Sequence, residues 1–198
     1  MYEQSKAAKR RFNDGAFHSR YFVGTGLDIG GGPDPLGQYR GIFQGMGEVA
    51  TWEYTDGDAQ YMAGVPDASY DFLHASHCLE HMRDPREALA NWIRVLRPGG
   101  FLIVTVPDED LYEHGLWPSP FNSDHKWSFT LCKAGASMPS SINMVDLAKQ
   151  LCADVELERL LLVRDFFREH LGAADQTMTP VAECAIEAIW RKRGGGAR

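Results

Sequence analysis

The strongest constraint on the fold of this chain is a short apolar segment that runs directly into three glycines. Gly26-Leu27-Asp28-Ile29 has the composition of a buried strand, and Gly30-Gly31-Gly32 follows it at once. Glycine lets a chain turn sharply and brings backbone N–H groups against a ligand. After this turn, the pattern predicts a helix from Pro35 to about Met46.

Downstream of the turn, apolar segments alternate with one clear helix. Helix 85–96 has Asp84 as its N-cap, proline at its first position and an apolar stripe at helical spacing. Residues 101–106 form an uninterrupted apolar run, which is typical of a strand covered on both faces. The other expected strands are 48–54, 69–75, 155–163 and 181–191, and the other expected helices are 3–12 and 142–152. This alternation predicts an α/β fold with a mostly parallel sheet and binding loops at the carboxyl ends of its strands.

Composition excludes several classes of protein. A net charge of −7 opposes binding to duplex nucleic acid, which is favoured by a basic face. The chain has no run of roughly 18 apolar residues and no apolar leader, so neither a membrane span nor a signal peptide is expected. The four cysteines lie far apart and are expected to be free thiols in a reducing, cytoplasmic compartment: Cys78, Cys132, Cys152 and Cys184.

Acidic residues accompany the glycine turn and the strand after it. The third glycine of a dinucleotide-binding turn is missing here, and Asp28 would repel a diphosphate but suit an ammonium or sulfonium group. Glu53 follows Asp28 by 25 residues, near the roughly 20-residue spacing at which an acid meets ribose hydroxyls, with Asp56 as the alternative. Asp58 stands beside the small residue Ala59, where a carboxylate can accept from an adenine amino group.

Taken together, these segments resemble the class I S-adenosylmethionine-dependent methyltransferases, most closely the small-molecule kind labelled methyltransferase type 11. The resemblance spans residues 20–110 and rests on LDIGGG, an acid after the second strand, GDA, SYDFLHASHCLEHMRDP and WIRVLRPGGFLIVTVPD. It implies a Rossmann-like, doubly wound, mostly parallel sheet whose last strand is antiparallel. It also implies S-adenosylmethionine as cofactor and S-adenosylhomocysteine as product.

The resemblance also implies a set of cofactor-binding residues. The methionine part would lie by Asp28, Gly30, Gly31 and Gly32, the ribose by Glu53, the adenine by Asp58 and Ala59, and the other side of the cofactor by His77 and Cys78. From their position just before the first strand, Arg20 and Tyr21 are expected to reach the cofactor's carboxylate.

One departure from the family pattern affects the size of the sheet. The family places a helix and a further strand between the ribose acid and the adenine aspartate, whereas only residues 54–57 separate Glu53 from Asp58 here. We therefore predict a sheet shortened by the loss of one strand and one helix.

The residues that act on the methyl acceptor are expected among the histidines. A hydroxyl acceptor benefits from a base with a pKa near neutrality, and the candidates are His125, then His81 and His77, with Asp124 or another carboxylate to orient the histidine. Four aromatic side chains of the same region are as consistent with an acceptor pocket as with simple packing: Trp117, Phe121, Trp127 and Phe129. His77 and His81 flank Glu80 at a spacing of four, but the order differs from a His-Glu-x-x-His site and no third ligand is evident, so no metal is expected.

We expect a single domain over 1–198, with an N-terminal helical part at 1–20, an acceptor-side loop at 107–141 and a mobile tail at 193–198. The basic residues of the N-terminal part are expected on a solvated helix face: Lys6, Lys9, Arg10 and Arg11. The predicted activity is O-methylation of a small molecule or glycan. N-methylation of an amino sugar or amine, an NAD(P)-dependent oxidoreductase, and a non-catalytic cofactor-binding module remain as alternatives, and a homodimer is left open.

Overall fold

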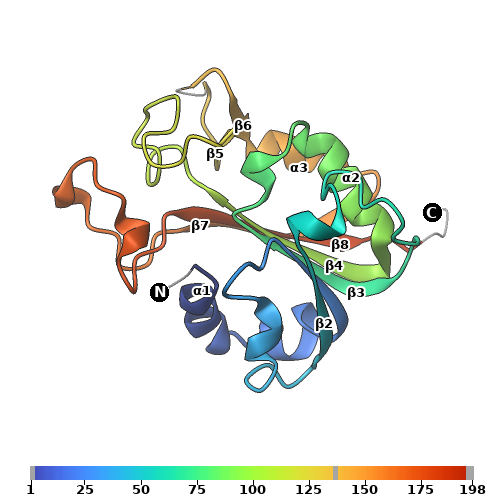
Figure 1. The fold of residues 1–198 in the computed structure, drawn as a ribbon. Helices are drawn as coiled ribbons and strands as arrows, with labels where there is room; N and C mark the ends of the chain where they lie inside the picture. The colour runs from blue at the N-terminus through green and yellow to red at the C-terminus, as the bar shows by residue number, and fades with distance from the viewer. Residues whose placement is uncertain (1–2, 136–137, 195–198) are drawn as a thin grey trace.

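The computed structural model describes residues 3–135 and 138–194, which form a six-stranded sheet with helices on both faces (Figure 1). The strand order is β2-β1-β3-β4-β8-β7. The strands are β1 Gly24–Ile29, β2 Met46–Trp52, β3 Tyr70–Ser76, β4 Leu96–Pro107, β7 Val155–Val163 and β8 Ala185–Lys192. The first four are parallel to one another, and β8 runs antiparallel to both β4 and β7. The predicted doubly wound, mostly parallel sheet with an antiparallel last strand is confirmed.

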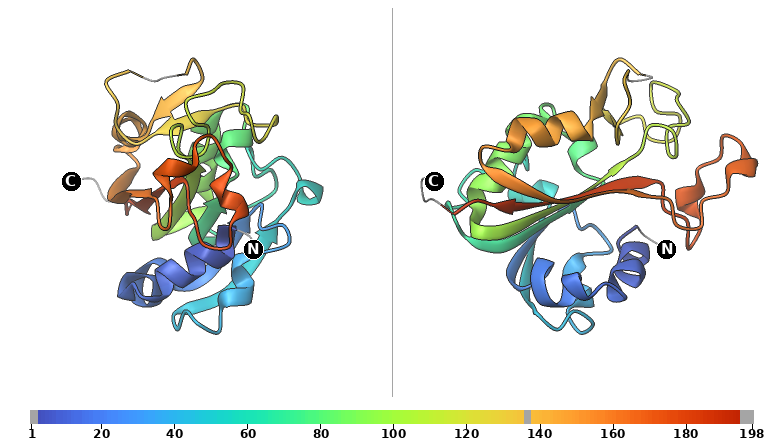
Figure 2. Two further views of the ribbon diagram at one scale, coloured as in Figure 1. Left: turned by 90° about the vertical axis from the view of Figure 1, so that its left-hand side faces the viewer. Right: turned by 180° about the vertical axis from the view of Figure 1, so that it is seen from behind.

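Helices cover the sheet from both sides (Figures 1 and 2). α1 (Glu3–Phe12) and the π-helical turn Phe17–Tyr21 lie on one face, and α2 (Pro85–Val95) and α3 (Met144–Leu151) lie on the other. A hydrophobic core lies on each face of the sheet. Alternate side chains of β4 belong to one core or the other, because successive residues of a strand point to opposite faces. Leu102 and Val104 join the core beneath α2 and α3, whereas Phe101 and Ile103 join the core on the α1 side.

The helix α2 begins where the sequence predicts. The Asp84 side chain accepts hydrogen bonds from the backbone N–H groups of Arg86 and Glu87, and Pro85 occupies the first turn. Its apolar stripe is buried against the sheet, with Trp92 and Leu89 fully enclosed. An N-cap of this kind contributes about 1 kcal/mol, and the buried stripe fixes how the helix packs on the sheet.

The predicted shortening of the sheet is also confirmed. Between β2 and β3 the structure has a 3-10 helix, Tyr54–Asp56, and no strand or α-helix. β2 is consequently the edge of the sheet. The chain therefore passes from the end of β2 to Asp58 within a few residues, and both remain at the same end of the sheet.

The helix expected from Pro35 to about Met46 is wrong. Only a 3-10 helix, Leu36–Tyr39, forms there, and turns lead from it into β2. Gly37, Gly41 and Gly45 interrupt this segment, and each glycine costs an α-helix about 1 kcal/mol relative to alanine. A Cβ on Gly45 would lie 2.6 Å from the carbonyl oxygen of His18, so the backbone approaches too closely here for other residues.

The region 107–141 is largely irregular, as expected, but it contains two short strands. β5 (Ser128–Thr130) pairs in parallel with β6 (Ser141–Asn143), which leads directly into α3. The Asn143 side chain caps α3 by accepting from the N–H groups of Val145 and Asp146. This places the loop above the carboxyl end of β4, beside α3 (Figure 1).

The expectation of a solvated basic face on the N-terminal helix is wrong for three of its four members, because only Lys9 is exposed. The Arg10 side chain is 16% exposed and is ion-paired with Glu183 and Glu187. Lys6 and Arg11 are buried, and both are bonded to the C-terminal part of the chain. Lys6 Nζ donates to the carbonyl oxygens of Thr177 and Ala182, at 2.5 Å and 3.0 Å. Arg11 donates to Glu187 Oε2 on β8, at 2.9 Å and 2.7 Å. These contacts pin α1 against the last strand and the loop before it.

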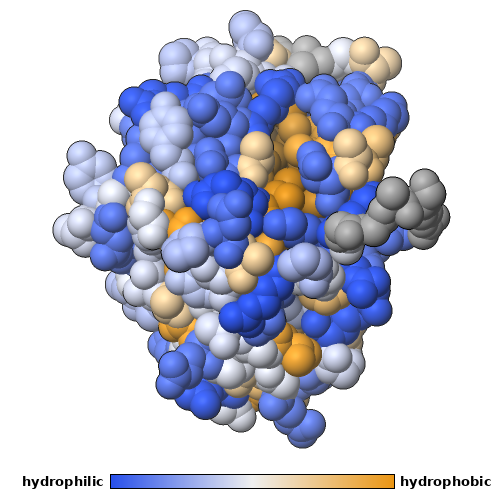
Figure 3. Space-filling view, turned by 90° about the vertical axis from the view of Figure 1, so that its right-hand side faces the viewer, coloured by the Kyte–Doolittle hydropathy of each residue, from blue (hydrophilic) through white to orange (hydrophobic). Residues whose placement is uncertain are grey.

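Among the described residues, no helix is both long and apolar enough to cross a membrane. All four cysteines are free, as predicted. The side of the molecule that lies on the right in Figure 1 is largely hydrophilic, with patches of hydrophobic residues between the polar ones (Figure 3). Of the tail predicted to be mobile, residues 195–198 lie outside the described residues.

Candidate functional site

Two adjoining pockets lie at the carboxyl ends of the parallel strands. The smaller has a volume of about 190 Å³ and the larger about 780 Å³, and both are lined by Ile29 and Gly30 at the end of β1. The larger pocket continues over Trp52 at the end of β2 and Cys78 after β3. Ligands of open α/β sheets bind at this edge, so the topology predicts a site where the structure has its pockets.

The glycine turn between the pockets depends on having no side chains. Gly30 and Gly32 have φ values of +69° and +52°, in the left-handed region that favours glycine. A Cβ on Gly31 would lie 2.7 Å from Asp28 Oδ2 and 3.1 Å from Cα of Pro35. The turn can therefore fold tightly beneath a ligand only with these glycines.

Both carboxylate oxygens of Asp28 accept hydrogen bonds beside the glycine turn. Oδ2 accepts from the N–H of Leu36 at 2.7 Å, and Oδ1 lies 2.7 Å from His74 Nδ1. His74 Nε2 lies 3.1 Å from Arg11 Nη1, which can only donate, so Nε2 accepts and Nδ1 carries the proton toward Asp28. Burial lowers the pKa of His74 and keeps the imidazole neutral. Asp28 still lines the smaller pocket, and its charge lies beside any ligand there.

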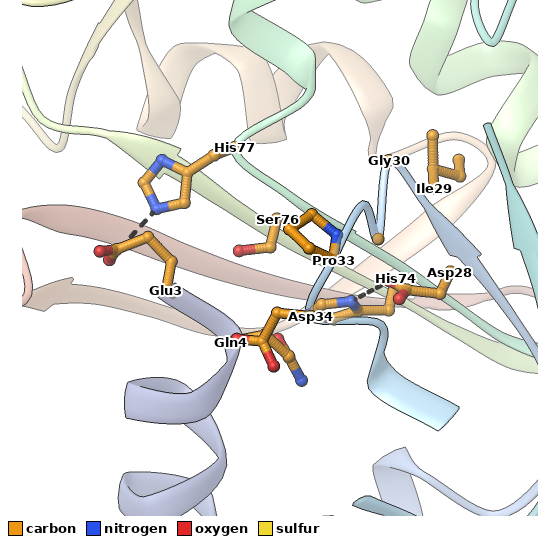
Figure 4. A pocket seen from close by; sticks show the side chains of 11 residues that line it. Glu3, Gln4, Asp28, Ile29, Gly30, Pro33, Asp34, His74, Ser76 and His77 are labelled. Atoms are coloured by element: carbon orange, nitrogen blue, oxygen red, sulfur yellow. Dashed lines mark hydrogen bonds and ion pairs between the residues drawn. The ribbon is translucent and has the colours of Figure 1, made fainter. Parts of the chain in front are cut away.

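The N-terminal helix contributes two residues that the sequence analysis missed. Glu3 and Gln4 of α1 line the smaller pocket, together with His77 and Asp34 (Figure 4). Gln4 is 6% exposed, and neither polar atom of its side chain has a hydrogen-bond partner among residues 3–135 and 138–194. A buried amide without partners is costly unless a ligand satisfies it. No motif marks these residues, and only the docking of α1 brings them to the sheet edge.

The two acids expected on the adenosine side line the larger pocket. Glu53 Oε1 accepts from the N–H of Gly32 at 2.9 Å, which ties the end of β2 to the glycine turn. The alternative, Asp56, does not line either pocket, because its carboxylate caps the backbone N–H of Glu53. Asp58 lies on the same wall, bonded to Arg83 at 2.6 Å, and Ala59 lies beside it.

His77 and Cys78 lie at the pockets as expected, one on each side of the turn. His77 lines the smaller pocket with a left-handed φ of +53°, and its N–H donates to the carbonyl of Thr105 at 2.9 Å. Cys78 lines the larger pocket close to Gly30. Burial raises the pKa of the Cys78 thiol far above its ordinary value, so this cysteine stays protonated and is not a nucleophile.

Arg20 and Tyr21 are not brought to the pockets. Arg20 pairs with Glu158 of β7 and lies over the ring of Phe101, and Tyr21 is buried against the same ring. The physical reason is topological. Residues that immediately precede a parallel strand lie at the amino end of the sheet, whereas the pockets are at its carboxyl ends.

His81 and Asp124 are brought together on the wall of the larger pocket. His81 belongs to the 3-10 helix Leu79–His81 after β3, and its Nδ1 lies 2.9 Å from Asp124 Oδ2. The loop that carries Asp124 is fixed to this helix. Backbone N–H groups of Lys126 and Trp127 donate to the carbonyl oxygen of Glu80, at 2.9 Å and 3.2 Å.

His125 lies directly behind His81, with the ring centroids 5.0 Å apart. It is buried, and its Nδ1 lies 2.7 Å from Oε1 of the fully buried Glu113. Glu80 lies on its other side, with Glu80 Oε1 3.9 Å from His125 Nε2. Burial alone would raise the pKa of Glu80, but the surrounding imidazoles outweigh it and lower this pKa. Glu80 and Glu113 were missed as site residues, because only the fold brings residues 80, 113 and 125 together.

The aromatic residues of the loop do not line either pocket. Phe129 is buried in the core beneath α3, and the Trp127 indole packs against that core and donates to the carbonyl of Met82. The ring of Phe121 packs on Tyr112 and His114. The sequence left two interpretations open, an acceptor pocket and simple packing. In the structure, these three side chains pack against other residues.

Comparison with known proteins identifies the family. A family model described as a methyltransferase domain matches residues 8–134, more than half of the chain. The chain belongs to this methyltransferase domain family. The resemblance inferred from the glycine turn and the residues after β3 is thereby confirmed.

Solved structures show that the methyltransferase domain shares its fold with distant proteins. The YcgJ protein of Bacillus subtilis superposes with a TM-score of 0.57 at 13% identity over 98% of each chain. An S-adenosylmethionine-dependent methyltransferase from Archaeoglobus fulgidus superposes with a TM-score of 0.58 at 15% identity, over 96% of this chain and 95% of that one. At these identities the likeness establishes the fold.

A curated protein matches a smaller part of the methyltransferase domain. An uncharacterised 37.1 kDa protein in transposon Tn4556 of Streptomyces fradiae is 48% identical over 46 residues, which are 23% of this chain and 13% of that protein. The family model assigns the chain to the methyltransferases, and the structural neighbours show that it has the fold of S-adenosylmethionine-dependent methyltransferases.

Proposed function

We propose that this protein transfers the methyl group of S-adenosylmethionine to a hydroxyl group of a small molecule or glycan. The observation that carries the proposal is the His81–Asp124 pair, which lines the same pocket as Glu53 and Asp58. An imidazole held by a carboxylate is a suitable base for a hydroxyl, and it lies where an acceptor would meet the cofactor. The net charge of −7 disfavours a nucleic-acid acceptor.

The residues at the two pockets fit the parts of the cofactor. The Glu53 carboxylate, which is bonded to the turn and caps the backbone N–H of Asp56, would accept hydrogen bonds from the ribose hydroxyls, and Asp58 and Ala59 would bind the adenine. The Gln4 amide, which has no hydrogen-bond partner in the described part of the chain, can donate and accept, which suits the carboxylate and ammonium groups of the methionine part. Asp28 adds a negative charge near the ammonium and sulfonium groups.

Once bound, S-adenosylmethionine supplies an electrophilic methyl carbon, whose bond to sulfur breaks as its bond to the acceptor oxygen forms, leaving a neutral thioether. The chain's own part is to position the acceptor and to handle the proton. With His81 Nδ1 donating to Asp124, the Nε2 atom of His81 is the one that accepts the hydroxyl proton and passes it to solvent. Positioning of the two reactants accounts for much of the rate in such a displacement.

The rim of the larger pocket suits a polar acceptor with several hydroxyl groups. Arg83, Asp124 and Lys126 line it, and Lys126 Nζ lies 3.4 Å from Asp124 Oδ1. Donors and acceptors are therefore interspersed around the opening, an arrangement that suits hydroxyl groups, which both donate and accept. This supports a sugar or polyhydroxylated acceptor over an apolar one.

The test is methyl transfer from labelled S-adenosylmethionine to a panel of sugars, phenols, amino sugars and amines. We expect label on hydroxyl oxygen, and His81→Asn should lower kcat by about 100-fold or more without changing the Kd of S-adenosylhomocysteine. Label on nitrogen alone would contradict O-methylation. Cofactor binding without transfer to any acceptor would favour a non-catalytic module, and binding of NAD(P) instead would favour an oxidoreductase.

A further inference from the structure

The feature that prompts a further inference is a buried carboxylate without hydrogen bonds. Glu80 is 0% exposed, and within the described ranges neither carboxylate oxygen has a hydrogen-bond partner. The nearest imidazole nitrogens are His77 Nδ1 at 3.6 Å and His125 Nε2 at 3.9 Å, both measured to Oε1. Buried charges in proteins are normally paired with hydrogen bonds or coordinate a metal. Among the described residues, Glu80 has only these two long ion pairs and no hydrogen bond.

Two imidazoles complete a possible ligand set around this carboxylate. Glu80, His81 and His125 each offer one ligand atom, and the three atoms lie within 4.8 Å of one another. Two ligands of a tetrahedral ion, each about 2.0–2.1 Å from the metal, lie roughly 3.4 Å apart. The separation of 3.9 Å between Glu80 Oε1 and His125 Nε2 is close to that value, so small side-chain rotations bring the set around one ion.

Each of the two imidazoles is oriented by its own carboxylate. His81 Nδ1 lies 2.9 Å from Asp124 Oδ2, and His125 Nδ1 lies 2.7 Å from Glu113 Oε1. A carboxylate on one ring nitrogen fixes the tautomer and leaves the other nitrogen as a ligand, which is the usual arrangement around metal-bound histidines. The sequence analysis considered only His77 and His81 beside Glu80 and found no further ligand. In the structure, His125 comes from a distant part of the chain to lie beside Glu80 and His81.

We propose that Glu80, His81 and His125 form a binding site for one divalent transition-metal ion. Two nitrogen ligands and one oxygen ligand suit zinc or iron(II), whereas magnesium prefers oxygen ligands throughout. Three protein ligands leave at least one coordination position open. Because His81 lines the larger pocket and the other two ligands are buried behind it, that position faces the pocket.

The role of the ion rests on the proposed function, although its binding does not. An acceptor hydroxyl at the open position would have its pKa lowered by the cation and would be held beside the cofactor. His81 would then serve as a ligand, and the hydroxyl proton would pass to water instead of to the imidazole. Metal dependence of methyl transfer therefore separates a metal-activated acceptor from an imidazole base.

The binding test uses the full chain without cofactor or acceptor. Cys132 and Cys152 are exposed thiols that compete for zinc, so both are first changed to serine. After removal of metals with EDTA, zinc chloride is titrated by calorimetry and cobalt chloride by absorption spectroscopy. We expect one ion per chain, a cobalt spectrum without thiolate charge transfer, and no comparable heat with magnesium chloride.

Ligand variants decide whether the ion lies at the proposed site. Glu80→Gln and His125→Asn should weaken zinc binding by about 100-fold, and Glu113→Gln by about 10–100-fold. The matched controls are Glu156→Gln and His170→Asn, which change exposed residues and should leave the affinity unchanged. If Glu80→Gln fails to fold, His81→Asn at the pocket wall replaces it. Equal zinc affinity in the ligand variants and the controls, or no zinc binding in the parent protein, would overturn the proposal.

Failure of the metal site and failure of the proposed function give different results. Zinc bound through these ligands, with no acceptor methylated, would leave the site standing and remove the O-methyltransferase proposal. If the protein binds no zinc and methyl transfer is unchanged after EDTA treatment, the proposed metal site is contradicted. The proposed methyltransferase function would then still stand.

Discussion

Two buried histidine–carboxylate clusters lie at the carboxyl end of the same sheet and differ in whether their polar atoms are satisfied. The closed cluster consists of Arg11, Asp28, His74 and Glu187, and every one of these side chains is bonded to another group. Arg11 donates hydrogen bonds to Glu187 and to His74, and His74 donates to one carboxylate oxygen of Asp28. The second oxygen of Asp28 accepts a hydrogen bond from a backbone N–H.

The open cluster consists of Glu80, His81, Glu113 and His125, and several of its atoms have no partner. Both carboxylate oxygens of Glu80 and one of Glu113 lack hydrogen bonds among the described residues, although both side chains are fully buried. The same residue types thus serve two purposes. A cluster whose groups satisfy one another stabilises the scaffold, and one with unsatisfied buried groups is suited to a ligand.

The largest expected effect is on stability, and it separates the two clusters. Glu187→Gln leaves the fully buried charge of Arg11 uncompensated, and we expect a loss of about 3–5 kcal/mol in the free energy of unfolding. The matched change in the open cluster, Glu80→Gln, removes a charge that has only the long contacts to His77 and His125 and no hydrogen bond, so it should cost less stability than the loss at Glu187. Urea unfolding of both variants measures the difference. Equal losses would mean that the two clusters do not differ as described.

Acid provides a second measure of the closed cluster. Burial would raise the pKa of Glu187, but Arg11 and Arg10 outweigh it and lower this pKa from 4.5 to about 2. Its contribution is therefore complete above pH 4.5 and is lost as the pH falls toward 2, amounting to about 3 kcal/mol. The stability difference between wild type and Glu187→Gln should shrink across this range. A difference that stays constant down to pH 2 would contradict the assignment.

A smaller effect is expected at the pocket beneath α1. Gln4→Ala removes the amide that we assign to the methionine part of the cofactor, and S-adenosylhomocysteine should bind about 10-fold more weakly, as expected for the loss of one or two hydrogen bonds. Glu80→Gln should leave this Kd unchanged, because Glu80 lies on the acceptor side. Calorimetry on the two variants tests whether cofactor and acceptor functions are separate.

The smallest effect is expected for Arg20→Ala, away from both clusters. The Arg20–Glu158 ion pair is nearly half exposed on the arginine side, at 46%, and such pairs contribute about 0–1 kcal/mol. Its distance from the pockets predicts no change in the Kd of S-adenosylhomocysteine. A marked loss of cofactor affinity, measured by calorimetry, would show that the amino end of the sheet takes part in binding.

Local sequence signals were enough to predict most of the fold, including the glycine turn at the carboxyl end of β1. The strands, the Asp84-capped helix and the glycine turn each depend on neighbouring residues, as does the missing element between Glu53 and Asp58. The prediction of a helix after Pro35 was wrong because it ignored a contact that is distant in the sequence. The close approach of Gly45 to the carbonyl of His18 is such a tertiary contact. Apolar periodicity does not reveal such contacts.

The cluster around Glu80 and the docking of α1 could not be predicted in this way. Glu113 and His125 are 12 residues apart and meet Glu80 only through a loop docked on the end of β3. Gln4 reaches the smaller pocket because buried ion pairs fix α1 to β8, and a basic run in the sequence gives no sign of its partners. The unsatisfied atoms that mark both places are properties of the packed structure.

The most direct test of the account is a calorimetric titration of S-adenosylhomocysteine into the wild-type protein and into Glu53→Ala. The account predicts one molecule bound per chain, with affinity reduced by about 10-fold or more in the variant, because Glu53 joins the glycine turn to the end of β2 and would bind the ribose. No binding by the wild type, or equal binding by the two proteins, would contradict the assignment of this pocket to the cofactor.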